Sequence, residues 1–379
     1  MRVLFISHDA SRSGAPIALL QELKLLCQNI KELNPTLLLL RGGELELEFS
    51  SLCPVIKINR SNNFFNRLLR RLKIRRFVYP YQYLFHKGQF DGIYANTVAS
   101  LELGCLLKKQ LSIPLIGHIH EAEAYMFQFP VRAEWISSCD LLITVSRLSE
   151  RNLIDNYGVP PQKIIIQHPI SFWIDKCMTG DVSIPMESDE DKEILIGCFA
   201  NGNWNKSTEI IPLIVKLFND KYPKYPCRFL IIGCMSDYVK YNLEFDIRKM
   251  GIEDQIVIYG EAKNPLEILS RIKILMVPSR EESFSLVAQE AGFMKKATVC
   301  FEGATGAAEW ICNGAGVIVP YMDLEKMVDA LYSLLVNNNQ RIQYGETAKR
   351  IVEEMYITDS QMKDVISSIR QLFPDVSSQ

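Results

Sequence analysis

The sequence has 379 residues, of which 48% are hydrophobic and 23% are charged, and its formal net charge is -2. Because this length exceeds what one hydrophobic core ordinarily serves, we expect two domains, each with a full core. The small net charge gives no general affinity for nucleic acid, and the average composition excludes a fibrous or disordered chain.

The cysteines and the amino terminus predict a cytoplasmic protein. The ten cysteines are scattered singly, without a CxxC pair, so the sequence predicts neither a disulfide framework nor a zinc site. The opening "MRVLFISHDAS" holds an apolar run too short for a secretion signal, and no apolar run reaches the roughly 18 residues of a membrane span. We therefore expect no metal, no cofactor and no membrane contact other than a peripheral one.

Residues 1–171 predict the first domain, built on a parallel sheet. Short apolar runs such as "RVLFIS", "PTLLLL", "GIYA", "PLIGHI" and "LLITVS" alternate with amphipathic stretches such as "APIALLQELKLLCQNI". This alternation is typical of buried parallel strands covered by helices. Since ligands of such sheets bind at the carboxyl ends of the strands, residues that follow each strand are the candidates for a site.

Two loops of this domain carry candidate residues. The loop "SHDASRSGAP" places Gly14 after the first strand, and "HIHEAEA" places His118, His120 and Glu121 after a later strand. A histidine pair flanked by carboxylates at a strand end can be catalytic, and it can equally be structural.

Residues 60–85, "RSNNFFNRLLRRLKIRRFVYPYQYLF", interleave seven basic residues with apolar ones at helical spacing and contain no acid. Such a helix can lie on an anionic membrane surface, to which each basic residue contributes about 1 kcal/mol. The alternative is a core helix with solvated arginines. The sequence therefore raises peripheral membrane contact as a hypothesis, on the inner face of the membrane, and nucleic acid is not expected as the partner.

Residues 172–192 are polar and acidic and predict an interdomain linker. Strand-like runs then resume with "ILIGCFA", "CRFLIIG", "IVIYG", "ILMVPS" and "ATVCF", so residues 193–355 predict a second doubly wound domain. We expect the two domains to face each other across a cleft. Residues 356–379 predict a C-terminal helix that packs back on the first domain.

The second domain holds the sharpest pattern. In "VPSREESFSLVAQEAGF", Glu282 and Glu290 stand eight positions apart, and the helix predicted near Ser285 begins between them. The backbone N–H groups of Phe284, Ser285 and Leu286 would be donors at its amino terminus, and Glu290 would lean back toward the same opening. Two carboxylates beside such a helix end suit a phosphorylated polyol such as a nucleotide sugar.

Two further loops follow strands of this domain. In "GCFANGNWNKST", Lys206 can donate to a diphosphate, although a lone lysine is usually only exposed. In "GATGAAEWI", Gly306 makes a small-residue turn and Glu309 follows it, which is also the pattern of a plain helix start.

Over nearly its whole length the chain resembles the retaining glycosyltransferases of family four, whose fold is two Rossmann-like domains (GT-B). The most specific match is the motif Glu, seven residues, Glu, at Glu282 and Glu290. The resemblance implies that Glu290 holds the ribose of a nucleotide-sugar donor. It further implies that Glu282, Ser283 and the amides from Phe284 to Leu286 hold the sugar.

Other positions match the family less completely. Its phosphate-binding lysine is Lys206, whereas its arginine is replaced by Asn201, and the glycine that follows the phenylalanine is Ser285. The resemblance also implies that Gly14 is the glycine turn of the first domain and that His120, followed by Glu121, is the active-site histidine. Gly306 and Glu309 match the family's GxxE turn.

These matches predict a glycosyltransferase in cell-surface polysaccharide biosynthesis, which moves a sugar to a glycan or lipid-linked acceptor with retention of anomeric configuration. His120, Glu282 and Lys206 would be its catalytic residues, and the nucleotide sugar would be a substrate. A catalytically silent sugar-nucleotide binding subunit and a sugar-nucleotide epimerase of the same build stay open. A nicotinamide dehydrogenase is disfavoured because no GxGxxG follows a strand, and the lysine spacing disfavours a phosphate-loop NTPase.

Overall fold

The computed structural model describes residues 1–57, 84–128, 131–185, 195–225, 227–357 and 360–373. The basic stretch predicted to contact membranes therefore lies almost wholly outside the described residues. The chain divides into two compact units. One comprises residues 1–145, 149–167 and 359–379, and the other comprises residues 146–148 and 168–358.

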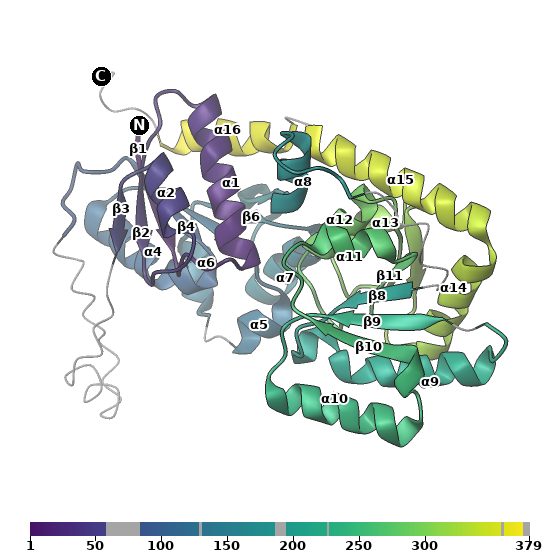
Figure 1. The fold of residues 1–379 in the computed structure, drawn as a ribbon. Coiled ribbons are helices and arrows are strands. Elements are labelled where there is room, and N and C mark those ends of the chain that lie inside the picture. The colour runs from purple at the N-terminus through teal and green to yellow at the C-terminus, as the bar shows by residue number, and fades with distance from the viewer. Residues whose placement is uncertain (58–83, 129–130, 186–194, 226, 358–359, 374–379) are drawn as a thin grey trace, which may run out of the picture. The chain divides into compact units, whose positions relative to one another are not determined.

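Within the described residues, the first unit is an α/β domain with seven strands, all parallel, in the order β3-β2-β1-β4-β5-β6-β7. Figure 1 labels β1 to β4 and β6 of this sheet. Its strands are β1 (Arg2–Ser7), β2 (Asn34–Leu39), β3 (Val55–Lys57), β4 (Gly92–Asn96), β5 (Leu115–Ile119), β6 (Leu141–Thr144) and β7 (Ile164–Ile166). Its helices are α1 (Gly14–Asn29), α2 (Glu46–Leu52), α4 (Val98–Leu111), α5 (Glu123–Gln128), α6 (Ala133–Ser138), most of α7 (Arg147–Tyr157), the 3-10 turn η2 (Pro161–Lys163) and α16 (Ser360–Leu372).

The described part of the second unit repeats the plan with six parallel strands in the order β10-β9-β8-β11-β12-β13. Its strands are β8 (Leu195–Phe199), β9 (Arg228–Ile232), β10 (Ile256–Gly260), β11 (Ile274–Val277), β12 (Ala297–Phe301) and β13 (Gly316–Val319). Its α-helices are α8 (Phe172–Met178), α9 (Ile211–Lys221), α10 (Asp237–Met250), α11 (Pro265–Arg271), α12 (Leu286–Phe293), α13 (Ala308–Ile311), α14 (Leu324–Val336) and α15 (Asn338–Ile357). Its 3-10 turns are η3 (Trp204–Lys206), η4 (Thr208–Ile210) and η5 (Glu253–Gln255).

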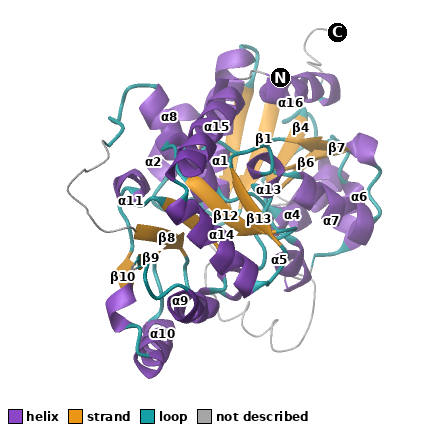
Figure 2. Ribbon diagram, turned by 90° about the vertical axis from the view of Figure 1, so that its right-hand side faces the viewer, coloured by secondary structure: helices purple, strands orange, loops and turns teal. Residues whose placement is uncertain are grey.

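Both strand orders reverse beside the first strand of their unit, as in Rossmann-like folds, so the predicted fold class of two Rossmann-like domains is confirmed. Figure 2 shows the strands covered by helices. Within the expected linker 172–192, the first seven residues form helix α8, which contacts α12 of the second unit. The C-terminal helix α16 belongs to the first unit.

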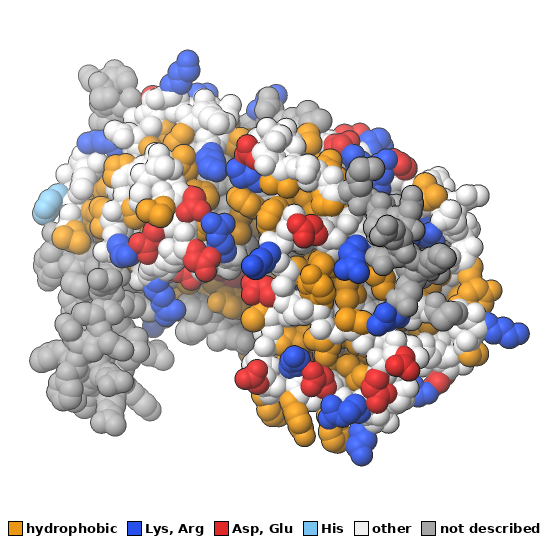
Figure 3. All heavy atoms as spheres, viewed as in Figure 1, with side chains coloured by type: hydrophobic (Ala, Val, Ile, Leu, Met, Phe, Trp, Pro, Cys, Tyr) orange, Lys and Arg blue, Asp and Glu red, His pale blue; other side chains and the backbone are white. Residues whose placement is uncertain are grey.

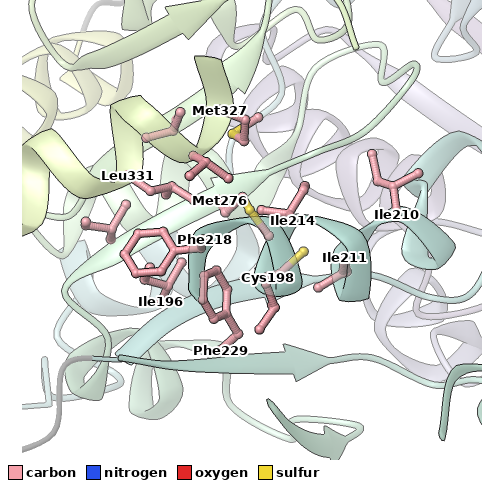
Figure 4. Close-up of a cluster of buried hydrophobic side chains, with 14 of the residues drawn as sticks. Ile196, Cys198, Ile210, Ile211, Ile214, Phe218, Phe229, Met276, Met327 and Leu331 are labelled. Carbon is pink, nitrogen blue, oxygen red and sulfur yellow. The ribbon is translucent and has the colours of Figure 1, made fainter. Parts of the chain in front are cut away.

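Side chains that alternate along each strand fill two separate cores, one on each face of the sheet. In β8, Ile196 and Cys198 enter one cluster, while Leu195 enters the other. Figure 4 shows the first cluster, in which Phe218 of α9 and Leu331 of α14 meet the strands. Where both faces are buried, as in β8 and β11, the strand reads as a continuous apolar run, which is the pattern that identified it in the sequence.

Local signals set several helix ends. Asn264 accepts a hydrogen bond from the backbone N–H of Leu266, and Pro265 occupies the first turn of α11. Asp323 caps α14 in the same way through the N–H of Lys326, and α10 ends at Gly251, whose φ of 65° suits glycine.

Candidate functional site

Three neighbouring loops of the second unit bring the predicted residues together. Strand β11 lies between β8 and β12 in the sheet, and all three are parallel, so their carboxyl ends lie at one edge. Lys206 follows β8, Glu282 follows β11 and Glu309 follows β12. Residues far apart in the sequence therefore meet at this edge.

Lys206 and Glu282 form a largely buried ion pair. The Lys206 Nζ lies 2.7 Å from Glu282 Oε1, and the two side chains are 22% and 6% exposed. The hydroxyl of Ser279 donates to the same carboxylate oxygen. Burial by itself would raise the pKa of Glu282, but the charge and hydrogen bond of Lys206 and the Ser279 hydroxyl hold that pKa below its ordinary value. Glu282 is therefore a carboxylate at neutral pH.

The backbone around Glu282 is fixed by the turn that follows β12. Glu282 N–H donates to the carbonyl of Ala304 at 2.7 Å, and Gly306 N–H donates to the carbonyl of Glu282 at 3.1 Å. A Cβ at Gly306 would lie 2.2 Å from the carbonyl oxygen of Ser283, so only glycine allows this close approach. Gly306 thus positions the loop, and its backbone holds Glu282 in place.

Glu290 lies on α12 and is buried. Its Oε1 accepts a 2.5 Å hydrogen bond from the hydroxyl of Ser171, which itself accepts from the backbone N–H of Trp173 at the start of α8. The adjacent Gln289 binds the same segment, since it accepts from the N–H of Ser171 and donates to the carbonyl of Pro169. Burial raises the pKa of Glu290 to about 7, against the opposing effect of the Ser171 hydrogen bond.

The amino terminus of α12 lies between the two glutamates in sequence. Ser285 precedes the helix with φ of 78° and ψ of 84°, a conformation that L-residues rarely adopt. The backbone N–H groups of Phe284, Ser285 and Leu286 precede the helical hydrogen-bonding pattern, so they are available donors. The strained turn aims the first turn of the helix, and such backbone strain recurs at ligand-binding sites.

The loop after β8 is contacted by a second cation, Arg280, which follows β11. Asn201, which replaces the family's arginine, is exposed, and the next turn contains Lys206. The guanidinium of Arg280 lies 5.4 Å from the ring centre of Trp204 and donates to the Trp204 carbonyl at 3.1 Å. It also pairs with Glu209, so it braces the turn that carries Lys206. Arg280 lies in the stretch "VPSREESFSLVAQEAGF", but the sequence alone gave it no role.

Glu309 is engaged with backbone and a histidine. One carboxylate oxygen accepts from the N–H groups of Arg147 and Leu148 at 2.6 and 3.3 Å, and the other lies 3.6 Å from Nε2 of His168. The His168 ring stacks on Phe284 with centroids 5.3 Å apart. An acid at the first turn of α7 is favourable because the N–H groups there carry partial positive charge.

The first unit places its candidates at the carboxyl edge of its own sheet. Gly14 is the first residue of α1 and is exposed. His120 follows β5, and its Nε2 lies 2.7 Å from Oδ1 of Asn96, at the end of neighbouring β4. Glu121 accepts from the backbone N–H groups of Val98 and His120.

Burial shifts both titratable groups of this pair toward neutrality. Burial is the main cause that holds the pKa of His120 well below its usual value. Burial also raises the pKa of Glu121 to about 7, despite its backbone hydrogen bonds. His120 is therefore a neutral imidazole at physiological pH.

Three features of the described residues bear on partners. No group of three or more His, Cys, Asp or Glu residues within them is arranged to hold a metal ion. No helix that the structure describes has the length and apolar character needed to cross a membrane. On the face shown in Figure 3, basic and acidic side chains are interspersed over the described surface.

Family models match both units of the chain. Residues 34–169 match the model of Glycosyltransferase Family 4, and residues 187–351 match that of Glycosyl transferases group 1. Together the two matches extend over most of the sequence and include Lys206, Glu282 and Glu290.

Individual relatives are distant. The lipopolysaccharide core biosynthesis mannosyltransferase LpcC of Rhizobium leguminosarum bv. viciae is 22% identical over 48% of this chain and 52% of its own length. The D-inositol 3-phosphate glycosyltransferase of Corynebacterium aurimucosum is 23% identical over 68% of this chain and 66% of its own. The chain thus spans about half to two thirds of the length of these relatives.

Among solved structures, HepE of Anabaena in complex with UDP-glucose superposes with a TM-score of 0.72 at 16% identity. The superposition covers 97% of this chain and all of that one, at 100%. At this identity the likeness demonstrates the fold, and the two family models carry the assignment. The chain therefore belongs to the family-four glycosyltransferases of the GT-B type.

Proposed function

We propose that this protein transfers a sugar from a nucleotide-sugar donor to a glycan or lipid-linked acceptor, with retention of anomeric configuration, in the synthesis of a cell-surface polysaccharide. The observation that carries the proposal is the cluster of Lys206, Glu282 and Glu290 around the amino terminus of α12. It combines one cation, two buried acceptors and free backbone donors, which together match a phosphorylated polyol.

Each group has a chemical task in this proposal. Glu290 accepts hydrogen bonds from the ribose hydroxyls, replacing the bond that Ser171 now gives it. Glu282 and the amides from Phe284 to Leu286 hold the sugar. Lys206 has three ammonium donors, of which one is used on Glu282, so the others remain for the diphosphate.

The departing diphosphate gains negative charge as its bond to the sugar carbon breaks. A charged hydrogen bond is worth roughly 1.5 to 3 kcal/mol, so Lys206 accounts for about a tenfold to hundredfold rate effect. Retention follows when the acceptor oxygen attacks from the face that the diphosphate leaves. The acceptor's proton then passes to an oxygen of the departing phosphate, and the new glycosidic bond replaces the sugar–phosphate bond.

Two similar proteins support the donor and acceptor classes of the proposal. HepE is solved with UDP-glucose, and LpcC is named for mannosyl transfer in lipopolysaccharide core synthesis. We therefore propose a hexose donor on a nucleoside diphosphate, with UDP as the first nucleotide to examine. The acceptor proposed is a growing surface glycan or its lipid carrier, and the protein would meet the carrier at the inner face of the membrane.

The test begins with calorimetric titration of UDP, GDP and their hexose conjugates into the full chain. A 13C-labelled donor that binds is then incubated with glycan and lipid-linked acceptors, and the anomeric configuration of the product is determined by NMR. Transfer with retention supports the proposal. Binding without turnover would identify a silent binding subunit, release of a free epimer would identify an epimerase, and no binding of any nucleotide would refute the donor site.

A further inference from the structure

A chain of buried polar side chains in the first unit leads to His120. It runs from Glu22 of α1 through Tyr94 of β4 and His118 of β5, and Asn96 of β4 contacts His120 directly. We infer that Asn96 is a positioning residue that fixes the proton of His120 on Nε2 and leaves Nδ1 as an acceptor for a substrate hydroxyl. This deepens the proposed function and rests on His120 being part of its site.

Asn96 can present only its oxygen to His120. Its Nδ2 donates to the backbone carbonyl of Ala15 at 3.2 Å, and because a carbonyl cannot donate, the amide nitrogen must face Ala15. The Asn96 Oδ1 is thereby turned to His120 Nε2, 2.7 Å away, and an oxygen that only accepts requires a proton on Nε2. Asn96 is fully buried, so water does not compete for either bond.

The neighbouring His118 carries its proton on the other nitrogen. The hydroxyl of Tyr94 donates to Glu22 Oε2 at 2.9 Å, since a carboxylate can only accept. The same hydroxyl lies 2.7 Å from His118 Nδ1, so its oxygen accepts from an Nδ1–H. Nδ1 also lies 3.3 Å from Glu22 Oε2, which favours the proton at that position.

His118 in turn supports the plane of the His120 ring. The two ring centroids are 3.9 Å apart and the planes are inclined by 31°. Because His118 is completely buried and tied to Tyr94 and Glu22, it forms a fixed surface under His120. The ring of His120 is thus held at its edge by Asn96 and at its face by His118.

This arrangement decides which ligand groups His120 recognises. Nδ1 of His120 makes no hydrogen bond to any other described residue, and a neutral ring with its proton on Nε2 carries a lone pair there. A lone pair attracts a hydroxyl proton and repels phosphate oxygens. His120 therefore contacts a hydroxyl of the sugar or acceptor and is not a phosphate ligand.

The proton position can be measured directly, without activity. The full chain is labelled with 15N-histidine, and the ring nitrogens are observed by two-bond 1H–15N correlation at neutral pH, with His120→Gln identifying the signals. The expected result is a neutral His120 ring protonated on Nε2, with His118 protonated on Nδ1. A His120 ring protonated on Nδ1, or on both nitrogens, overturns the inference.

Variants of Asn96 connect the proton position to turnover. Asn96→Leu removes the acceptor, so the tautomers should mix and kcat should fall about tenfold at unchanged donor affinity. Asn96→Asp keeps an accepting oxygen, so the proton on Nε2 of His120 should persist. The negative charge of the aspartate should also keep Nδ1 of His120 protonated up to a higher pH. Ser100→Ala, a buried hydroxyl on α4 without a partner among the described residues, is the control.

The outcomes separate the two proposals. If the wild-type chain shows the expected tautomer and Asn96→Leu loses it with full turnover, Asn96 has no positioning role in catalysis. If the tautomer is wrong while transfer proceeds, the inference fails and the proposed function stands. If the tautomer is right while no donor is bound or turned over, the proposed function fails, and with it the role of Asn96.

Discussion

The hydroxyl of Ser171 donates a 2.5 Å hydrogen bond to the carboxyl group of Glu290, and both side chains are buried. The two residues are separated by 119 positions in the sequence. This bond partly satisfies a carboxyl group whose burial would otherwise be unfavourable, and it occupies the oxygen proposed to hold a ribose. In the proposed donor complex, a ribose hydroxyl would compete with the Ser171 hydroxyl for this oxygen.

Glu290→Gln should make the protein more stable at neutral and alkaline pH. The folded pKa of about 7 lies above the ordinary 4.5, so only the unfolded state ionises as pH rises between these values. The wild-type free energy of unfolding therefore falls as the pH rises from 4.5 to about 7. Above pH 7 this loss of stability is complete and amounts to about 3 kcal/mol. Urea unfolding across this pH range measures it. The exposed Glu267→Gln is the control, and equal pH profiles for Glu290→Gln and wild type would contradict the prediction.

Lys206→Met should destabilise the fold as well as weaken diphosphate binding. It leaves Glu282 buried at 6% exposure without its cation, and losing one member of a buried pair costs about 3 kcal/mol. Adding Glu282→Gln should recover part of this loss, because the uncompensated charge disappears. A double-mutant cycle by urea unfolding decides it, and additive effects of the two changes would show that the pair is not coupled.

Ser285→Gly should raise stability by about 1 kcal/mol, because it removes the cost of an L-residue at φ of 78°. This gain exceeds the stability that is lost because glycine makes the unfolded chain more flexible. Ser283→Gly, whose backbone has no positive φ, is the matched control and should lower stability. Thermal unfolding of both variants tests the prediction, which is wrong if Ser285→Gly melts below the wild type.

His120→Ala should reduce turnover far more than donor affinity, because the proposed role of the ring is to contact the reacting sugar or acceptor. Steady-state kinetics with a saturating donor, together with calorimetry, separate the two effects. The exposed His86→Ala in the same unit controls for the loss of an imidazole. A large loss of donor affinity at normal maximal rate would place His120 at the nucleotide instead.

Residues 60–85 should bind anionic membranes, a prediction that rests on the sequence since residues 58–83 lie outside the described part. The native chain should sediment with phosphatidylglycerol vesicles at low salt and be released at high salt. Replacing Arg70, Arg71, Arg75 and Arg76 by Gln should abolish sedimentation.

The control for vesicle binding removes the same number of charges elsewhere. Four exposed lysines of the second unit serve for this purpose: Lys224, Lys240, Lys249 and Lys263. If both substituted chains lose sedimentation equally, the binding depends on overall charge. If neither chain loses it, the binding belongs to another surface.

The sequence predicted inner strands such as β1, β4 and β11 because they are buried on both faces, which leaves an uninterrupted apolar run. It did not predict the partly exposed edge strands β3, β7 and β13. It also identified Glu282, Glu290 and Lys206 as neighbours of strand ends, and the family assignment is confirmed by the two family models. The sequence could not show which of these side chains contact one another. That Lys206 contacts Glu282 depends on the order of strands in the sheet, and that order is a long-range property.

The missed residues share one feature: their role depends on a partner that is distant in the sequence. Ser171 and Asn96 carry common polar side chains with no local motif, and their meaning comes from Glu290 and His120. The glycosyltransferase roles of His120 and Glu290 were inferred by resemblance, and they remain predictions that the variants above address.

The last helix completes the first unit's core. Ile369 and Phe373 are buried there, and the Phe373 ring lies so close to Gly92 of β4 that a Cβ on that glycine would be 2.2 Å from it. During synthesis the ribosome makes β4 long before this helix. The first unit therefore gains the packing of α16 only after residues 360–373 have been made, and their synthesis follows that of the whole second unit.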